Sequence, residues 1–161
     1  MAVNRGKQFE NVIKECLERV DNVSVNRIHD QTNGFRGSKN ICDFIVYKYP
    51  NQFYFECKTV HGNRLPFSNI SDTQWQGLLE KSKIRGVRAG VICWWVDKDV
   101  TAFIDITMLE NIKSFPTLGR QSIRYDCLKT SNFIPIKGKK KRIFFDYDMG
   151  EFLSEFRHGA Y

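Results

Sequence analysis

The chain has 161 residues, a hydrophobic fraction of 42% and a formal net charge of +7 at pH 7. This length suits one domain with a buried core, and the apolar content excludes a disordered chain. There is no apolar run that could span a membrane and no apolar signal core, so the default expectation is a cytoplasmic protein without membrane contact. The basic charge favours a polyanionic partner such as nucleic acid, although this signal is weak by itself.

Missing motifs exclude several kinds of chemistry. The five cysteines contain no CxxC pair and no Cys/His spacing of a zinc site, so reduced core cysteines are expected. The three histidines share no ligand spacing and are expected in loops or at the surface. No GxxxxGK[ST] loop is present for nucleotide hydrolysis, and no GxSxG motif indicates a serine hydrolase.

The first elements in chain order are a helix and a strand. Apolar residues recur at helical spacing over residues 4–20, and Asn4 is a suitable N-cap for that helix. Residues 22–30 alternate loosely between apolar and polar side chains and predict a strand. A short, polar, Gly-containing loop over about 30–41 then leads into the segment 42–58.

Segment 42–58 predicts a β-hairpin because it is rich in β-branched and aromatic residues and has Pro with Asn at its centre, over 49–52. Asp43 stands at the start of its first strand, and Glu56 and Lys58 stand at the end of its second. Residues two apart leave the same face of a strand. If the strands pair, Asp43 lies beside Glu56 and Lys58 at one end of the hairpin.

The rest of the chain completes an α/β pattern. The further elements expected are a loop over 59–71, a helix over 72–85, strands over 87–96 and 100–106, a helical turn over 107–113 capped by Thr107, a helix over 122–129, a basic hairpin over about 132–147 and a helix over 150–156. This order predicts a central mixed β-sheet flanked by helices, in a single domain over 1–161.

The charged end of the hairpin offers a metal site. Two carboxylates, with the backbone carbonyl of Cys57 between Glu56 and Lys58, are oxygen ligands that suit Mg²⁺ or Mn²⁺. Such an ion would activate a water, and Lys58 would orient that water or stabilise phosphate oxygens, which amounts to phosphodiester hydrolysis. The alternative is a solvated strand with ordinary charges, since acid-x-Lys pairs are common. The cost of burying charge beside an apolar hairpin raises the weight of the metal site, so that from these residues alone the two interpretations are about equally supported.

Two further features leave alternatives open. Trp94 and Trp95 alternate across a buried strand, so at least one is expected in the core, although either could stack on bases. The basic run over 137–142 is either a solvated turn or a loop that binds phosphates, and the net positive charge favours the second.

These positions resemble the PD-(D/E)xK nuclease superfamily, in which an acidic helix precedes Asp and then Glu-x-Lys. A closer resemblance is to the RecU family of Holliday-junction resolvases, including its phage-type members. The segments that carry it are Asn4-Arg5-Gly6 with Phe9-Glu10, Asp43 and Glu56 at 13 positions apart, Leu65 to Ile70 followed by Gln74, and the apolar strand from Gly86 to Trp95. Residue 42 is Cys where the family often has Thr, and the span over about 30–41 is short where RecU has a long stalk.

The resemblance implies a restriction-endonuclease-like fold and a homodimer that cuts two opposed strands of a four-way DNA junction with Mg²⁺ or Mn²⁺. By analogy, Asp43 and Glu56 bind the metal, Lys58 is catalytic, Glu10 assists at the metal and Gln74 contacts the site. The residues expected to contact DNA are Arg5, Arg36, Lys39, Arg64, Lys137, Lys139, Lys140, Lys141 and Arg142. Because the stalk is short, a nuclease of broader specificity for branched DNA or flaps is an alternative. Because the net charge is basic, a DNA-binding accessory protein that does not cut is a second alternative.

Overall fold

The computed structural model describes residues 4–29, 40–115 and 120–156. Its centre is a six-stranded sheet in the order β1-β2-β3-β5-β6-β8. These strands are β1 (Ser24–Arg27), β2 (Phe44–Lys48), β3 (Asn51–Val60), β5 (Val87–Trp95), β6 (Val100–Asp105) and β8 (Phe133–Pro135). Strands β3 and β5 pair in parallel and every other neighbour in this sheet pairs antiparallel. The sheet is therefore mixed, as predicted.

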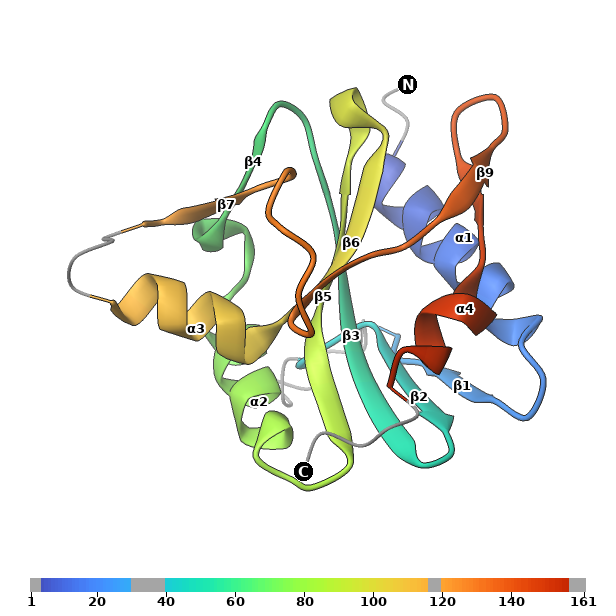
Figure 1. Ribbon diagram of the computed structural model, residues 1–161, viewed down its shortest axis with the longest axis horizontal. Coiled ribbons are helices and arrows are strands. Elements are labelled where there is room, and N and C mark those ends of the chain that lie inside the picture. The colour runs from blue at the N-terminus through green and yellow to red at the C-terminus, as the bar shows by residue number, and fades with distance from the viewer. Residues whose placement is uncertain (1–3, 30–39, 116–119, 157–161) are drawn as a thin grey trace, which may run out of the picture.

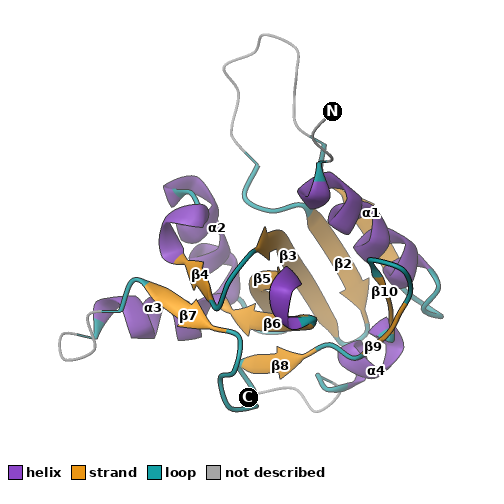
Figure 2. Cartoon of the chain, turned by 90° about the horizontal axis from the view of Figure 1, so that it is seen from above, coloured by secondary structure: helices purple, strands orange, loops and turns teal. Residues whose placement is uncertain are grey.

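Helices and two small sheets cover both faces of the central sheet. The helices are α1 (Arg5–Glu18), α2 (Asp72–Ser82), α3 (Ile106–Ser114) and α4 (Met149–Ser154), with short 3-10 turns η1 (Phe67–Asn69) and η2 (Val96–Lys98). The small sheets pair β4 (Arg64–Pro66) with β7 (Ser122–Arg124) and β9 (Gly138–Lys140) with β10 (Phe145–Tyr147). Figure 2 shows α1, α4 and the β9–β10 hairpin on one face, and α2, α3 and the β4–β7 pair on the other.

Each face of the sheet has its own apolar core. Phe55 and Trp94 point to the face covered by α1 and α4, whereas Tyr54 and Trp95 point to the face covered by α2 and α3. Both tryptophans are fully buried, so neither is available to stack on bases. Neighbouring residues on a strand point to opposite faces, and because both faces are covered the two indoles go into two different cores.

Helix α1 begins as its sequence predicts. The side chain of Asn4 accepts a hydrogen bond of 3.1 Å from the backbone N–H of Lys7, which satisfies one of the free donors at the helix start. Phe9, Ile13 and Leu17 bury the apolar stripe of the helix against the sheet. This packing fixes the first turns of α1, and with them Glu10, beside the edge of the sheet.

The predicted hairpin is β2 followed by β3. Phe44 pairs with Phe55 and Lys48 pairs with Asn51, so the turn is only two residues, 49–50, and Asn51 already belongs to the strand. Asp43 lies just before β2, but its backbone N–H still donates to the carbonyl of Phe55 at 3.0 Å. Strand β3 runs on to Val60, beyond the predicted end of the hairpin, because β5 pairs with it along nearly its whole length, from Gln52 to Val60.

The C-terminal third differs most from the prediction. Residues 122–124 form strand β7 and not a helix, because Ile123 points into the core between two half-exposed residues and β4 supplies a partner. The basic hairpin expected over 132–147 is shorter: its strands are β9 and β10, and residues 133–135 join the central sheet as β8. The cap of α3 is Asp105, which accepts from the N–H of Thr107, and not Thr107 itself.

Two expectations from composition concern the chain as a whole. All five cysteines are free, and four of them are buried, as core cysteines should be. Within residues 4–29, 40–115 and 120–156, no helix has the length and apolar character needed to cross a membrane.

Candidate active site

Asp43 and Glu56 meet at the open end of the β2–β3 hairpin. The continued register places them opposite each other, since the next pair along is Phe44 with Phe55. The Asp43 carboxylate is fixed across the hairpin, because its Oδ2 accepts a hydrogen bond of 2.8 Å from the backbone N–H of Cys57. This contact turns the Asp43 side chain toward β3 and next to Glu56.

Glu56 is a buried carboxyl in an unfavourable position. Only 2% of the residue is exposed, and its Oε2 has no hydrogen-bond partner in the described parts of the chain. Burial is the largest cause that raises its pKa, to about 10, and the hydrogen bond and negative charge of Asp43 add to this. Without a bound metal ion, Glu56 is therefore protonated at neutral pH and can donate a hydrogen bond to Asp43.

Lys58 lies on the same face of β3 as Glu56. Its Nζ is 3.9 Å from Glu56 Oε2, so the two groups form a loose ion pair. The ammonium lowers the pKa of Glu56, but burial and Asp43 together have the larger effect. The lysine side chain keeps 22% of its surface exposed, so its amine lies between the buried carboxyl of Glu56 and the solvent.

Glu10 is connected to the site through Arg27, which the sequence did not single out. Arg27 Nη2 is 2.8 Å from Glu10 Oε2, and its Nη1 donates to Asn11. The pKa of Glu10 is raised, first by burial and then by the negative charge of Asp43, while Arg27 opposes the shift. Arg27 pairs with Phe44, the residue after Asp43. The sequence offers only its place in the loose alternation of β1, which does not by itself indicate a contact with Glu10.

Gln74 has a local structural role. Its side chain accepts from the backbone N–H of Ser71, and the Ser71 hydroxyl accepts from the N–H of Gln74, so the two residues form a capping box at the start of α2. One turn later, Gly77 packs directly on Ile41: a Cβ at this position would lie 2.2 Å from Ile41 Cγ2. The contact of Gly77 with Ile41 brings α2 against the segment that carries Asp43.

The donor set fits a small, hard cation. The buried Oε2 of Glu56 and the neighbouring Asp43 carboxylate are the kind of oxygen ligands that Mg²⁺ and Mn²⁺ prefer, and a cation would remove the need for a proton on Glu56. In the described part of the chain, no three side chains of His, Cys, Asp or Glu are grouped tightly enough to hold a metal. A site here would therefore use two carboxylates with backbone or water oxygens. The assignments of Glu10 and of the Cys57 carbonyl as further ligands stay predictions.

The basic residues expected to contact DNA have different surroundings. Arg36 and Lys39 lie outside the described residues, as does most of the stalk-like loop. Arg64 is exposed on β4, where its guanidinium donates to the hydroxyl of Ser122. The guanidinium of Arg5 lies 5.5 Å from the ring centroid of Phe144. The remaining five belong to the run over 137–142, in and beside the β9–β10 hairpin.

Comparisons with known proteins identify the family of this chain and a likeness of its fold. The sequence model of a family described as Recombination protein U (RecU) matches residues 19–147, most of the chain and all of the β2–β3 hairpin. Glu10 and Arg5 precede the matched span. No curated protein matched the sequence.

One solved structure similar to this chain is that of Hjc from Archaeoglobus fulgidus, described as a Holliday junction resolvase from an archaeal hyperthermophile. The similarity has a TM-score of 0.50 at 16% identity and covers 82% of this chain and 88% of that chain. At this identity the likeness concerns the fold, and it confirms the predicted restriction-endonuclease-like arrangement of sheet and helices.

Proposed function

Because this chain belongs to the RecU family of Holliday-junction resolvases, we propose that Asp43, Glu56 and Lys58 form the centre at which it hydrolyses junction DNA. The observation that carries this assignment is the buried Oε2 of Glu56, which lies beside the Asp43 carboxylate, has no hydrogen bond within the described residues and forms only the loose ion pair with Lys58. A buried acid placed beside a second, partly buried acid is costly unless a positive group binds them. A structural role alone gives no reason to keep both.

The carboxylates of Asp43 and Glu56, with the backbone carbonyl of Cys57, would hold Mg²⁺ or Mn²⁺. When bound, the ion lowers the pKa of a coordinated water and neutralises charge on the phosphate. The hydrogen bond from Cys57 N–H holds Asp43 in place without a further side chain. Glu10 assists from the edge of the sheet, where Arg27 keeps its carboxylate oriented.

Lys58 orients the attacking water or stabilises the phosphate oxygens. Its amine lies 3.9 Å from Glu56 at the boundary between the buried acids and the solvent, which is where a phosphate from outside would arrive. Gln74 caps the start of α2, the helix that packs on Ile41, and so helps to position the segment that leads into Asp43. We also assign to Gln74 a direct contact with the scissile phosphate.

A four-way junction has two opposed strands to cut, and the single chain described here carries one such centre. We therefore assign a homodimer with one centre for each strand, in which residues 1–161 act as a single nuclease domain. The net charge of +7 supports binding to a branched polyanion.

The deciding experiment is cleavage of a synthetic four-way junction with and without Mg²⁺. Asp43→Ala and Lys58→Ala should abolish cutting while junction binding persists, and Glu80→Ala, an exposed acid on α2, should cut normally. A second readout is thermal: Mg²⁺ should raise the melting temperature of the wild type and leave that of Asp43→Ala unchanged. Normal cutting by either site variant would refute the assignment.

The short span over about 30–41 favours a second candidate, a nuclease of broader specificity for branched DNA and flaps. Cleavage of junction, flap, splayed arm and plain duplex should be compared at one salt concentration, because electrostatic binding depends strongly on salt. Equal rates on flap and junction would favour this candidate. Tight junction binding without any metal-stimulated cutting would instead indicate an accessory protein.

A further inference from the structure

The β9–β10 hairpin carries an excess of positive charge that the nuclease centre does not use. Five of the six residues over 137–142 are Lys or Arg. Two of them are bound within the fold: Lys137 pairs with Glu151 at 3.3 Å, and Lys140 pairs with Asp99 at 2.7 Å. These two cations fasten the hairpin to α4 and to the turn between β5 and β6.

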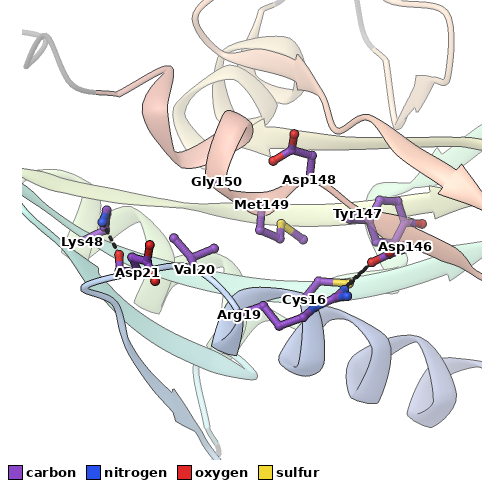
Figure 3. Close-up of a pocket in the computed structure, with 10 residues that line it drawn as sticks. All are labelled: Cys16, Arg19, Val20, Asp21, Lys48, Asp146, Tyr147, Asp148, Met149 and Gly150. Carbon is purple, nitrogen blue, oxygen red and sulfur yellow. Dashed lines mark hydrogen bonds and ion pairs between the residues drawn. The ribbon is translucent and has the colours of Figure 1, made fainter.

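The base of the hairpin is held firmly by other contacts. The hydroxyls of Tyr147 and Thr101 are 2.6 Å apart in the interior, and the ring of Phe144 packs on Trp94 at a centroid distance of 5.4 Å. Asp146 is bound by Arg19 at the rim of a cavity of about 600 Å³ between α1 and the β10–α4 junction (Figure 3). The hairpin is therefore a fixed projection from the sheet.

Three cations at and near the hairpin tip have no such role. Lys139, Lys141 and Arg142 are exposed, and within the described residues none of them forms an ion pair. The acid that faces Lys139 in the register is Asp146, which Arg19 already occupies. Like charges held this close repel one another. Lys141 also attracts the Asp146 carboxylate and helps to lower its pKa, but the ion pair of that carboxylate is with Arg19.

The position of this hairpin relates the three cations to the nuclease centre. Arg5, the first residue of α1, lies over Phe144 at the base of the tip. Glu10 is five residues further along the same helix, which is about 7.5 Å along the helix axis at 1.5 Å per residue. Trp94, which packs on Phe144, pairs with Thr59, the residue after Lys58. The hairpin therefore lies on the face covered by α1, at the end of the sheet where β3 runs on from Lys58 to Val60, while the Lys58 side chain itself points to the other face (Figure 1).

We propose that Lys139, Lys141 and Arg142 bind the backbone phosphates of a duplex arm of the DNA whose strand is cut at Asp43 and Glu56. This inference rests on the proposed function, because it needs a DNA substrate at that centre. Lys137 and Lys140 set the direction of the hairpin, and Arg5 adds a cation at its base. The tip makes no contact with base edges, so its contribution is independent of sequence.

The test compares two matched double variants. One is Lys141→Gln with Arg142→Gln at the tip. The control is Lys83→Gln with Arg85→Gln, which also removes one exposed lysine and one exposed arginine. These two residues come just before β5, whose first residue, Val87, pairs with Gln52 at the opposite end of the sheet. Binding of a four-way junction and of a linear duplex is measured at several salt concentrations without divalent metal, and unfolding curves establish that both variants fold.

The tip variant should lower the slope of log affinity against log salt by about 1.8, since each lost phosphate contact removes about 0.9, and should weaken binding roughly tenfold at low salt. The same change is expected on the linear duplex, because the tip contacts an arm. The control should keep the wild-type slope. An unchanged slope for the tip variant, or a loss confined to the junction, overturns the proposal. Asp43→Ala tests the nuclease centre separately, since it should bind with the wild-type slope and not cut.

Discussion

Replacing Glu56 by Gln should make the metal-free protein more stable at neutral pH while it abolishes cleavage. Glutamine keeps the size of the side chain and can donate to Asp43 as the protonated acid does. It carries no charge, so it does not have to bind a proton when the chain folds. The burial that raises the pKa of Glu56 then no longer acts against folding.

The magnitude follows from the shift in pKa. The pKa of Glu56 rises from 4.5 to about 10 on folding. Between these values the folded state holds a proton that the unfolded state has released. The free energy of unfolding is therefore highest below pH 4.5, where Glu56 is protonated in both states, and it falls progressively as the pH rises toward 10. At pH 7 the loss is about 3 kcal/mol, at 1.36 kcal/mol for each pH unit above the unfolded pKa. Total stabilities of small domains are only about 5–15 kcal/mol, so the effect is large.

The assay is urea unfolding in the presence of a chelator at pH 5, 7 and 9. The free energy of unfolding of Glu56→Gln should exceed that of the wild type by about 3 kcal/mol at pH 7, by more at pH 9, and by little at pH 5. Glu80→Gln, at an exposed position on α2, is the control and should follow the wild type. Parallel pH profiles for the wild type and Glu56→Gln would refute the reasoning, because they would mean that Glu56 folds without taking up a proton.

Three further substitutions test other contacts. Gly77→Ala should lower the free energy of unfolding by about 1–3 kcal/mol and slow cleavage, because the new Cβ overlaps Ile41 and this outweighs the better helix propensity of alanine. An unchanged melting temperature and cleavage rate would contradict this. Arg27→Gln removes a group that lowers the pKa of Glu10, so that pKa, followed by NMR, should rise; a constant value would show that the ion pair is unimportant. Asp105→Ala removes the cap of α3 and should lower the melting temperature by about 2–8 °C, and no shift would argue against the cap.

The parts of the fold that follow from neighbouring residues could be predicted from the sequence. The hairpin brings Asp43 to Glu56 because its strands are adjacent in the chain and their pairing needs no distant partner. The start of α1 at Asn4 is equally local. The one parallel pair, β3 with β5, was expected only as part of a mixed sheet, because its register depends on the packing of the crossover between them.

Features that depend on distant partners were missed. Residues 122–124 became a strand because β4 offers an edge, and no local pattern distinguishes this from one turn of helix. Arg27 binds Glu10 only because β1 lies beside α1, and a single half-buried arginine in a strand gives little warning of this. The same holds for the division of the basic run: which lysines pair with Asp99 and Glu151 depends on where the hairpin docks.

From the way Glu56 is buried, we also expect a particular order of events during folding. Its contact with Asp43 is local and can form within the roughly 1–10 μs of hairpin formation. Its neighbour on the other side, Val91, belongs to β5, which must wait until the crossover containing α2 has closed. The carboxyls therefore meet while still in water and are desolvated late. In the metal-free chain the proton is taken up in that late step, so the folding rate should fall as the pH rises.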